Sequence, residues 1–376
     1  MGNSYTSVET QYTNIKLLIG LKENVRLKEL NAILQCLFHI VPLTNYIKYK
    51  FDKIEDIESY KSFHKKKICL TDSLKDLMDK VWPKDLKGKR DDSLKTVSKT
   101  EDSKDFLETI YKIDPNYNEN QEFLINFIIM RLHKELNRIQ YLGEECVKSN
   151  LKDKNAAFKI FRDDFLKKHQ SKISDYCFGT YYTRTYCFNC KNNFYTFQPY
   201  IYGVYALDQV YNYKCQTINN GSNVLYMNRI FNIYEINVHD CLYYDKQLKC
   251  NMLTCEHCKF MTQSSFKNVI YLSPRILIFI FNQNVMLSNK RYIIEEKIDI
   301  DYFVEKKGYT KYFLVGMVFS IAFQKNYIAY CRSPIDNKWY CYNDSQVQMK
   351  NSFQEIIMAH GIPYILFYQL SSHING

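Results

Sequence analysis

Apolar residues recur at three- and four-residue steps in the stretch that follows Gly20-Leu21. This spacing puts the apolar side chains on one face of a helix and the polar side chains on the other. The apolar positions are Leu30, Ile33, Leu34, Leu37 and Val41. The pattern predicts an amphipathic helix that begins shortly after a turn.

A second helix is predicted over residues 69–82, where apolar residues again form a single stripe. The sequence Trp82-Pro83 ends this helix, because proline cannot continue the backbone hydrogen bonding. The next residues, 84–104, are charged and nearly free of large apolar side chains. They are predicted to form a surface loop or a locally disordered insertion.

A third helix is predicted within residues 118–139, where Phe123, Phe127 and Met130 share one helical face. The residues that follow, 141–172, are rich in lysine and only loosely patterned. No regular element is predicted there.

Strands dominate the second half of the chain. Aromatic and β-branched residues alternate from about residue 171 to Tyr205, which is typical of half-buried strands. Two aliphatic runs, within residues 268–282 and 363–370, predict buried strands. The helical patterns therefore come first in the chain, and the strand patterns follow.

This order suggests a division of the chain into parts. Residues 1–14 are polar and predicted to be a flexible tail, and residues 15–371 are predicted to form the folded domain. Within that domain we expect helices over about 20–170 and mainly strands over about 171–371. A chain of 376 residues with 46% hydrophobic residues can bury one large core or two modest ones.

Charge narrows the range of partners. The formal net charge of +11 is compatible with nucleic acid, an anionic membrane or an acidic protein. The basic residues are scattered, however, and the main run is only Lys65-Lys66-Lys67. We therefore expect no specific nucleic-acid binding.

The sequence also indicates where the protein resides. It has no apolar run long enough to span a bilayer, and its first residues lack the apolar core of a signal peptide. We expect a cytoplasmic or nuclear protein that is not secreted. The opening MGNSYT fits the N-myristoylation pattern with Gly2 as the acceptor, and a chance match in a polar tail is the alternative. Peripheral membrane attachment is expected only if Gly2 is acylated, and one acyl chain alone binds membranes weakly.

Four of the 13 cysteines form two CxxC pairs, Cys187 with Cys190 and Cys255 with Cys258. Four thiolates from two hairpin-like turns supply the tetrahedral sulfur set that zinc prefers. Reduced, unpaired thiols are the alternative. A site closed by four cysteines leaves no open position for a substrate, so the predicted zinc is structural.

Several stretches together resemble the ubiquitin-specific proteases, a papain-like family of deubiquitinases. The resemblance extends over about residues 15–370 and includes the two CxxC pairs. Its matching residues are Gly20, Leu21, Leu34, Gln35, Cys36 and Leu37; Glu122, Phe123 and Leu124; Leu132, His133, Glu135 and Leu136; Trp339, Tyr340, Asn343, Asp344 and Ser345; and 363–370. It implies an α+β fold with a helical thumb over about 20–170 and palm and fingers over about 171–371. It also implies a structural zinc, and ubiquitin or a ubiquitin-like protein as partner. A larger protein complex is also compatible with it.

The residues that carry this family's chemistry are replaced at three of four positions. The family uses a cysteine thiolate activated by a histidine, which an acidic or amide side chain orients. By resemblance, Lys28 stands at the cysteine position, Asn326 at the histidine position and Glu23 at the oxyanion-hole position, and Asp344 is retained. An ammonium is not a thiolate nucleophile, an amide cannot accept the proton, and a carboxylate repels a developing oxyanion.

No other residue is predicted to restore the reaction. Cys36 matches a family position inside the helix and is expected in the core, and none of the eight histidines fits the base position. Glu23 and Lys28 are predicted to form an ion pair that fills the old site. We therefore expect a catalytically degenerate member that binds ubiquitin or scaffolds a complex. An active deubiquitinase and an interaction module that no longer binds ubiquitin are the alternatives.

Overall fold

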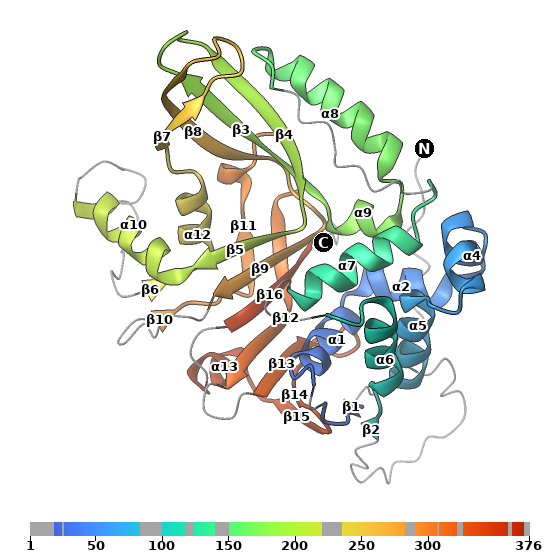
Figure 1. Ribbon diagram of the computed structural model, residues 1–376. Helices are drawn as coiled ribbons and strands as arrows, with labels where there is room; N and C mark the ends of the chain where they lie inside the picture. The colour runs from blue at the N-terminus through green and yellow to red at the C-terminus, as the bar shows by residue number, and fades with distance from the viewer. Residues whose placement is uncertain are drawn as a thin grey trace. The chain divides into compact units, whose positions relative to one another are not determined.

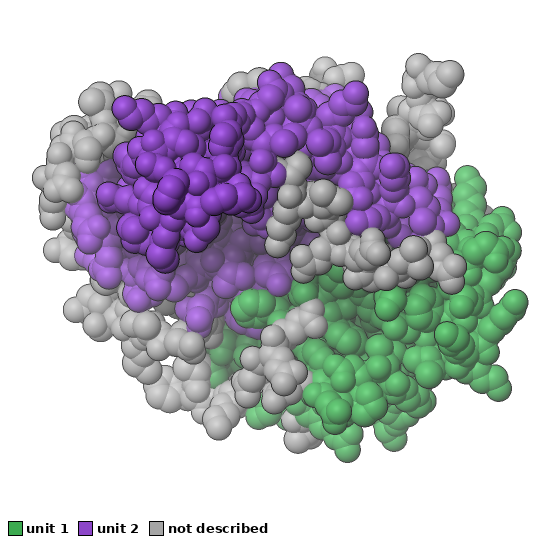
Figure 2. Space-filling model, turned by 45° about the horizontal axis from the view of Figure 1, so that its top comes forward, with its two compact units in different colours: residues 1–135, 315–360 green, residues 136–314, 361–376 purple. Residues whose placement is uncertain are grey.

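The computed structural model describes residues 19–24, 26–82, 100–117, 123–139, 150–219, 235–282, 291–306, 308–321, 326–359 and 363–371. The chain forms two compact units, coloured separately in Figure 2. Unit 1 holds residues 1–135 and 315–360, and unit 2 holds residues 136–314 and 361–376. The predicted tail and Gly2 lie outside the described residues.

Unit 1 opens with strand β1 (Gly20–Leu21), which pairs in parallel with β2 (Thr100–Glu101). Residues 84–99 of the predicted insertion lie outside the described residues, whereas its last residues form β2 and begin a helix. The helices of unit 1 are shown in Figure 1 and are α1 (Leu30–Phe38), α2 (Val41–Tyr49), α3 (Phe51–Glu55), α4 (Glu58–Lys65), α5 (Leu70–Val81), α6 (Lys104–Ile113) and α7 (Leu124–Glu135).

The first predicted helix is confirmed as α1, and all nine of its residues are buried. It is shorter than predicted, because Val41 begins α2 instead of ending α1. Pro42 lies in the first turn of α2, where its missing N–H is tolerated, but it would interrupt one continuous helix. The other two predicted helices are confirmed as α5 and α7.

The strands of unit 1 form successive antiparallel pairs from β12 to β15. They are β12 (Lys311–Ile321), of which residues 315–321 belong to unit 1, β13 (Asn326–Arg332), β14 (Trp339–Asn343) and β15 (Gln346–Lys350), followed by α13 (Phe353–Ala359). Helix α1 packs against β13 and β14. Gly316 is required at this contact, because a Cβ there would lie 2.9 Å from the sulfur of Cys36.

Unit 2 contains a four-stranded antiparallel sheet in the order β4-β3-β8-β7. Its strands are β3 (Gly179–Cys187), β4 (Asn193–Tyr200), β7 (Lys249–Thr254) and β8 (Met261–Leu272). Helix α8 (Lys154–Lys168) lies along β4 on one face of this sheet (Figure 1). Its Ala157 and Phe161 pack there against Tyr182 and Phe197.

The second group of strands in unit 2 has β9 between β16 and β5. The predicted central strand is confirmed as β9, in which six of seven residues are buried. The remaining elements of unit 2 are β5 (Tyr202–Ala206), β6 (Glu235–Ile236), β9 (Ile276–Asn282), β10 (Arg291–Tyr292), β11 (Lys297–Asp299), β16 (Pro363–Leu370), α9 (Lys172–Cys177), α10 (Leu207–Asn219), α12 (Val238–Asp245) and the 3-10 turn Asp301–Phe303.

Helices α8 and α9 are absent from the sequence-based prediction. Helix α8 exposes Ile160 and Leu166 while it buries Ala157 and Phe161, so its apolar pattern is blurred. Helix α9 occupies the beginning of a predicted strand region, because the Ser171 side chain caps its first turn. No single helix in the described part of the chain is long and apolar enough to cross a bilayer, and only α1 and α2 together, bent by 84°, reach that length and composition.

Candidate active site and metal centre

The loop before α1 is shaped by Asn24, whose Oδ1 accepts hydrogen bonds from the backbone N–H groups of Arg26 at 3.0 Å and Leu27 at 3.2 Å. Lys28 follows this turn, two residues before α1 begins, and is partly buried. Within the described residues it forms neither a hydrogen bond nor an ion pair. A cation near the positive end of a helix dipole is unfavourable, so this position does not stabilise α1.

The predicted ion pair between Glu23 and Lys28 is wrong: the described residues include both, and no such pair forms. The Asn24 turn separates the two residues, and the Glu23 side chain is exposed. Water solvates an exposed carboxylate well, so pairing it with a flexible lysine would gain little.

The retained Asp344 is bound by an amide. Its Oδ1 accepts a hydrogen bond of 2.7 Å from Nδ2 of Asn31, on the first turn of α1. The same Nδ2 also donates to the backbone oxygen of Lys22 at 2.7 Å, and Oδ1 of Asn31 accepts from Oγ of Ser103 at 2.8 Å. Asn31 therefore fastens α1 to the turn between β14 and β15.

The backbone around Asp344 supports the same fastening. The N–H of Leu21 donates to the carbonyl oxygen of Asp344 at 2.9 Å. A Cβ at Gly20 would lie 2.6 Å from that oxygen, so only glycine fits the close approach of β1. Asp344 itself has a φ of 48°, in the left-handed region. These contacts give Asp344 a structural role in unit 1.

Asn326 begins β13 and does not contact the Asp344 carboxylate through any hydrogen bond of the described residues. Its Nδ2 donates instead to Oδ1 of Asn343 at 3.2 Å, and its Oδ1 accepts from the N–H of Tyr327 at 2.9 Å. The structure thus brings Asp344, its neighbour Asn343 and Asn326 into one group. Asn31, three residues after Lys28, is the residue of this segment that contacts the group, through its hydrogen bond to Asp344.

The other thiols of this region, Cys36, Cys331 and Cys341, are buried or partly buried. Cys36 and Cys331 are both fully buried, and their sulfur atoms lie 3.8 Å apart in the core of unit 1. Burial raises the pKa of Cys331 well above its ordinary value, and burial also raises the pKa of Cys341. The expected core position of Cys36 is confirmed. A buried thiol with a raised pKa is a poor nucleophile.

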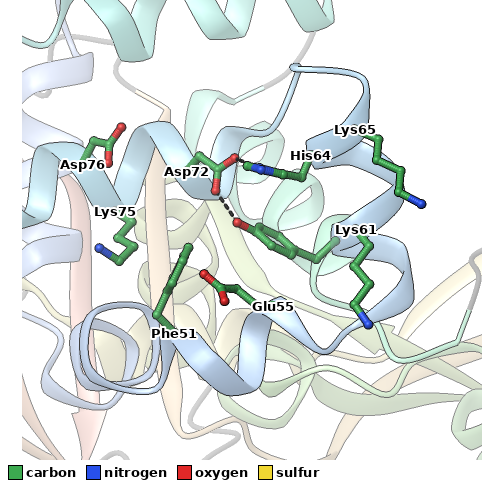
Figure 3. A pocket seen from close by; sticks show the side chains of 9 residues that line it. Phe51, Glu55, Lys61, His64, Lys65, Asp72, Lys75 and Asp76 are labelled. Carbon is green, nitrogen blue, oxygen red and sulfur yellow. Dashed lines mark hydrogen bonds and ion pairs between the residues drawn. The ribbon is translucent and has the colours of Figure 1, made fainter.

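Unit 1 also has a pocket of about 630 Å³ that the sequence did not suggest (Figure 3). It is lined by Phe51, Glu55, Tyr60, Lys61, His64, Lys65, Asp72, Lys75 and Asp76. Asp72 accepts hydrogen bonds from Oη of Tyr60 at 2.5 Å and from Nδ1 of His64 at 2.8 Å. This is an imidazole–carboxylate pair, but a nucleophile is required as well for covalent chemistry.

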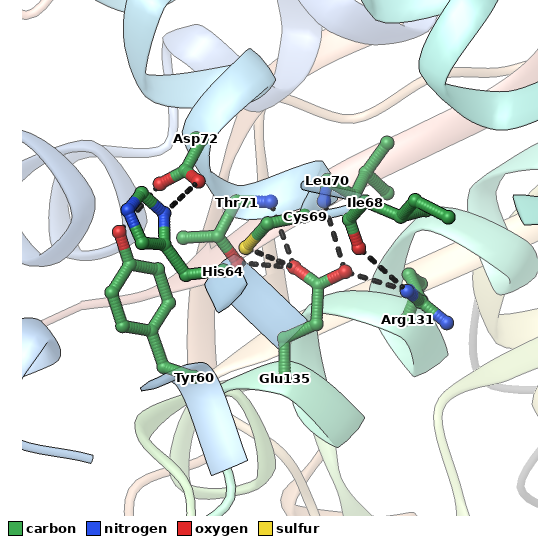
Figure 4. A network of polar contacts seen from close by, with 9 residues as sticks. All are labelled: Tyr60, His64, Ile68, Cys69, Leu70, Thr71, Asp72, Arg131 and Glu135. Atoms are coloured by element: carbon green, nitrogen blue, oxygen red, sulfur yellow. Dashed lines mark hydrogen bonds and ion pairs between the residues drawn. The ribbon is translucent and has the colours of Figure 1, made fainter. Parts of the chain in front are cut away.

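The nearby thiol of Cys69 does not supply that nucleophile (Figure 4). It donates to the fully buried Glu135, which also accepts from the N–H groups of Leu70 at 2.9 Å and Thr71 at 2.8 Å and from Nε of Arg131 at 2.6 Å. Burial, and then the Glu135 charge, raise the pKa of Cys69. Glu135 therefore caps the N-terminus of α5. This structural role explains why a glutamate stands at this position of the Leu132–Leu136 motif.

In unit 2 the two CxxC pairs come together. The sulfur atoms of Cys187, Cys190, Cys255 and Cys258 all lie within 4.8 Å of one another. The separation is 3.9 Å both for Cys187 and Cys258 and for Cys190 and Cys255. Four sulfurs at zinc–sulfur distances of about 2.3 Å in a tetrahedron are about 3.8 Å apart. The donor set therefore fits a zinc ion.

Both CxxC turns have the same backbone geometry. The N–H of Lys191 donates to the oxygen of Cys187 at 2.9 Å, and the N–H of Lys259 donates to the oxygen of Cys255 at 2.8 Å. The two lysines have φ angles of 55° and 61°. A non-glycine residue in this region is uncommon, so its occurrence at equivalent places indicates two matching turns.

The surroundings favour thiolates at the exposed end of the cluster. Nδ2 of Asn189 contacts the sulfur of Cys258 at 3.4 Å and lowers the pKa of Cys258 to about 6. The Asn192 side chain lowers the pKa of Cys190, whereas burial raises the pKa of Cys187 to about 11. Thiolates are the form that binds zinc.

The chain matches a family model described as "Ubiquitin carboxyl-terminal hydrolase" over residues 29–368. Curated relatives include ubiquitin carboxyl-terminal hydrolase 2 of Rattus norvegicus, 23% identical over 379 residues that cover 94% of this chain and 54% of that protein. Ubiquitin carboxyl-terminal hydrolase 12 of Saccharomyces cerevisiae is 28% identical over 186 residues, which cover 46% of this chain and 14% of that protein. The chain thus spans about half the length of the rat relative.

Solved structures show a similar fold. A SAGA DUB module of Ubp8, Sgf11, Sus1 and Sgf73 bound to monoubiquitin matches with a TM-score of 0.58 at 15% identity. The match covers 97% of this chain and 71% of that chain. At this identity the likeness concerns the fold, and it confirms the predicted α+β architecture.

Proposed function

The chain belongs to the ubiquitin carboxyl-terminal hydrolase family, and we propose that it binds ubiquitin or a ubiquitin-like protein without hydrolysing it. One observation carries the proposal. The carboxylate of Asp344, which would orient a catalytic imidazole, accepts a hydrogen bond from the Asn31 amide, and an amide also stands at Asn326. We propose that Lys28 stands at the cysteine position, and neither an ammonium nor the Asn326 amide can serve as the nucleophile or its base.

A nucleophile and its base act together, so the loss of either removes nearly the whole contribution of the pair. Lys28 and Asn326 together replace both members, and the exposed Glu23 would repel a developing oxyanion. Helix α1, which follows Lys28, is buried and packs on β13, which Asn326 begins, and on β14. The protein can therefore bind ubiquitin without hydrolysing it.

We also propose that Cys187, Cys190, Cys255 and Cys258 hold one structural zinc ion. It would join the β3–β4 turn to the β7–β8 turn and so stabilise the end of the sheet. Reduced cysteines at this site agree with a cytoplasmic or nuclear location, which is part of the proposal. Acylation of Gly2 would add a weak membrane attachment.

A larger complex is a further part of the proposal. The similar Ubp8 structure is a module with Sgf11, Sus1 and Sgf73. A binding protein without catalysis acts through what it brings together, so a scaffold in such a complex suits this chain. Co-purification of stable subunits with the tagged full-length chain would support it.

Isothermal titration calorimetry with ubiquitin tests binding. If the ubiquitin tail lies beside Lys28, the ammonium would pair with the free C-terminal carboxylate. Ubiquitin with a free carboxylate should then bind about tenfold more tightly than ubiquitin with an amidated C-terminus. Lys28→Met should abolish the preference, and Lys28→Arg should retain it.

The results separate the candidate functions. Equal binding of both forms would retain the ubiquitin proposal and contradict the role of Lys28. The absence of binding to either form would overturn the proposal and favour an interaction module with another partner. Family membership favours one further candidate, an active deubiquitinase. Release of a fluorophore from the ubiquitin C-terminus would support that alternative.

A further inference from the structure

Strand β7 is an exposed edge of the four-stranded sheet in unit 2. Five of its six residues are exposed, and within the described part of the chain it pairs only with β8. Exposed edge strands present unpaired backbone groups that can accept another strand. Natural edges are usually protected, so an open one calls for an explanation.

The register identifies the backbone groups that face outward. The N–H of Phe188 donates to the oxygen of Gln263, so Gln263 directs its backbone groups toward β3. Neighbouring residues of a strand alternate, and therefore Ser264 directs its groups toward its partner Asn251 on β7. The alternation leaves the N–H and C=O groups of Cys250, Met252 and Thr254 pointing away from β8.

The side chains along this edge are apolar and accessible. Met252 and Met261 lie on the same face of the sheet, because Met252 pairs with Gln263 and Met261 is two residues away on β8. Phe188 lies opposite Gln263 and therefore on the same face. The exposed fractions are 58% for Met252, 69% for Met261 and 46% for Phe188. Helix α8 covers the same face only farther down, at Tyr182.

Basic side chains outnumber acidic side chains around the edge. Arg184 and Lys267 lie directly opposite each other in the β3–β8 register, although opposed like charges destabilise a sheet. The segments 184–194 and 249–267 carry five basic residues and a single acid, Glu256. The zinc centre proposed for their four cysteines would add a net charge of −2, because four thiolates bind one Zn²⁺, and the balance stays positive. The five basic residues form no ion pair with another described residue. An acidic partner would compensate them.

We propose that β7 binds an extended, acidic and apolar peptide segment of a partner protein by strand addition. The peptide backbone bonds to the outward groups of Cys250, Met252 and Thr254. Its alternate apolar side chains contact Met252 and Met261, and its carboxylates approach the basic residues. The inference goes beyond the proposed function, because it uses neither ubiquitin nor the positions of Lys28 and Asn326.

Fluorescence anisotropy tests the proposal with the zinc-loaded full-length chain. The probe is a fluorescein-labelled octapeptide of alternating glutamate and valine, and the control peptide has lysine in place of glutamate. We expect saturable binding of the acidic peptide that weakens as salt is added, and at least about tenfold weaker binding of the control. Ubiquitin is absent, so the result is independent of ubiquitin binding.

Two variants locate the site. Met252→Pro removes one outward N–H and leaves the hydrogen bonds to β8 in place, and it should weaken binding about tenfold. The double variant Lys259→Glu/Lys267→Glu should weaken it at least as much, whereas Lys159→Glu on α8 should bind like the parent. Zinc content and circular dichroism confirm the fold of each variant. Equal affinity for the two peptides, or unchanged affinity in Met252→Pro or in the double variant, would overturn the proposal.

Discussion

Two regions of the molecule differ in which functional side chains they contain. One is the region around α1 and β13 in unit 1, and the other is the cysteine cluster in unit 2. Helix α1 is fully buried and Asn31 fastens it to Asp344, whereas Lys28 and Asn326 are the residues that we propose stand in place of the reactive groups. In the cluster all four sulfur donors are present and close together. We infer that a family fold can retain the residues that stabilise it while the residues that perform its chemistry are replaced.

Asp344 illustrates the difference. Its identity alone suggests a surviving catalytic acid, but its carboxylate binds Asn31 and its carbonyl oxygen binds Leu21. Both contacts fasten segments of unit 1 to one another. The presence of Asp344 is therefore explained by structure and does not indicate activity.

The largest effect is expected at the cysteine cluster. Cys255→Ser removes one thiolate ligand, and structural zinc sites contribute about 10–16 kcal/mol of apparent binding free energy in peptides. We expect zinc content to fall from about one ion per chain to a small fraction, with a lower unfolding temperature. Plasma mass spectrometry and a thermal melt measure both. Cys250→Ser, at an exposed cysteine outside the cluster, is the matched control, and full zinc occupancy in Cys255→Ser would refute the site.

The second-largest effect is expected in unit 1, on the free energy of unfolding. Glu135→Ala removes the cap of α5 and leaves Arg131 without its carboxylate, at a cost of about 3–5 kcal/mol in the free energy of unfolding. Urea denaturation measures this cost. Glu108→Ala, at a more exposed carboxylate, should change the free energy of unfolding by less than about 0.5 kcal/mol. Similar effects of the two substitutions would contradict the role of Glu135.

We expect the free energy of unfolding to depend on pH through one buried histidine in each unit. Burial lowers the pKa of His39 in unit 1 and of His169 in unit 2 to about 4, from 6.5. The unfolded chain binds more protons between these values, so stability must fall as the pH decreases from about 6.5 to about 4. For the fully buried His39 the loss is up to about 3 kcal/mol. His39→Gln should flatten the dependence measured by urea denaturation, while the exposed His257→Gln should leave it steep.

The smallest effect is expected from a single restored residue. Lys28→Cys should yield no hydrolysis of a fluorogenic ubiquitin substrate, because Asn326 still cannot accept the thiol proton. The triple variant Glu23→Asn/Lys28→Cys/Asn326→His should give measurable turnover. Hydrolysis by Lys28→Cys alone would show that another group serves as the base.

The sequence predicts the elements whose pattern is local. Helices α1, α5 and α7, strand β9 and the paired CxxC turns follow from periodicity and spacing within short windows. Helix α8 was missed, because it mixes buried Phe161 with exposed Ile160 and Leu166. The boundaries of the thumb at about 20–170 and of the palm and fingers at about 171–371 stay predictions.

The contacts that define the site are long-range, and for that reason the sequence did not reveal them. Asn31 and Asp344 are 313 residues apart, and Glu135 caps a helix that begins 65 residues earlier. The residues around Asn31 give no indication that Asp344 is its partner. The predicted Glu23–Lys28 pair is wrong for a different reason, because the local turn made by Asn24 separates two residues that are close in sequence.

The central claim is that unit 1 keeps the family fold without a reactive thiol. The most direct test is incubation of the purified protein with ubiquitin that carries a thiol-reactive C-terminal group, followed by intact-mass spectrometry. A catalytically active family hydrolase serves as the positive control. The account predicts that the mass of this protein remains unchanged while the control forms its adduct. An adduct of one ubiquitin per chain would contradict it, and peptide mapping would then identify the cysteine that reacted.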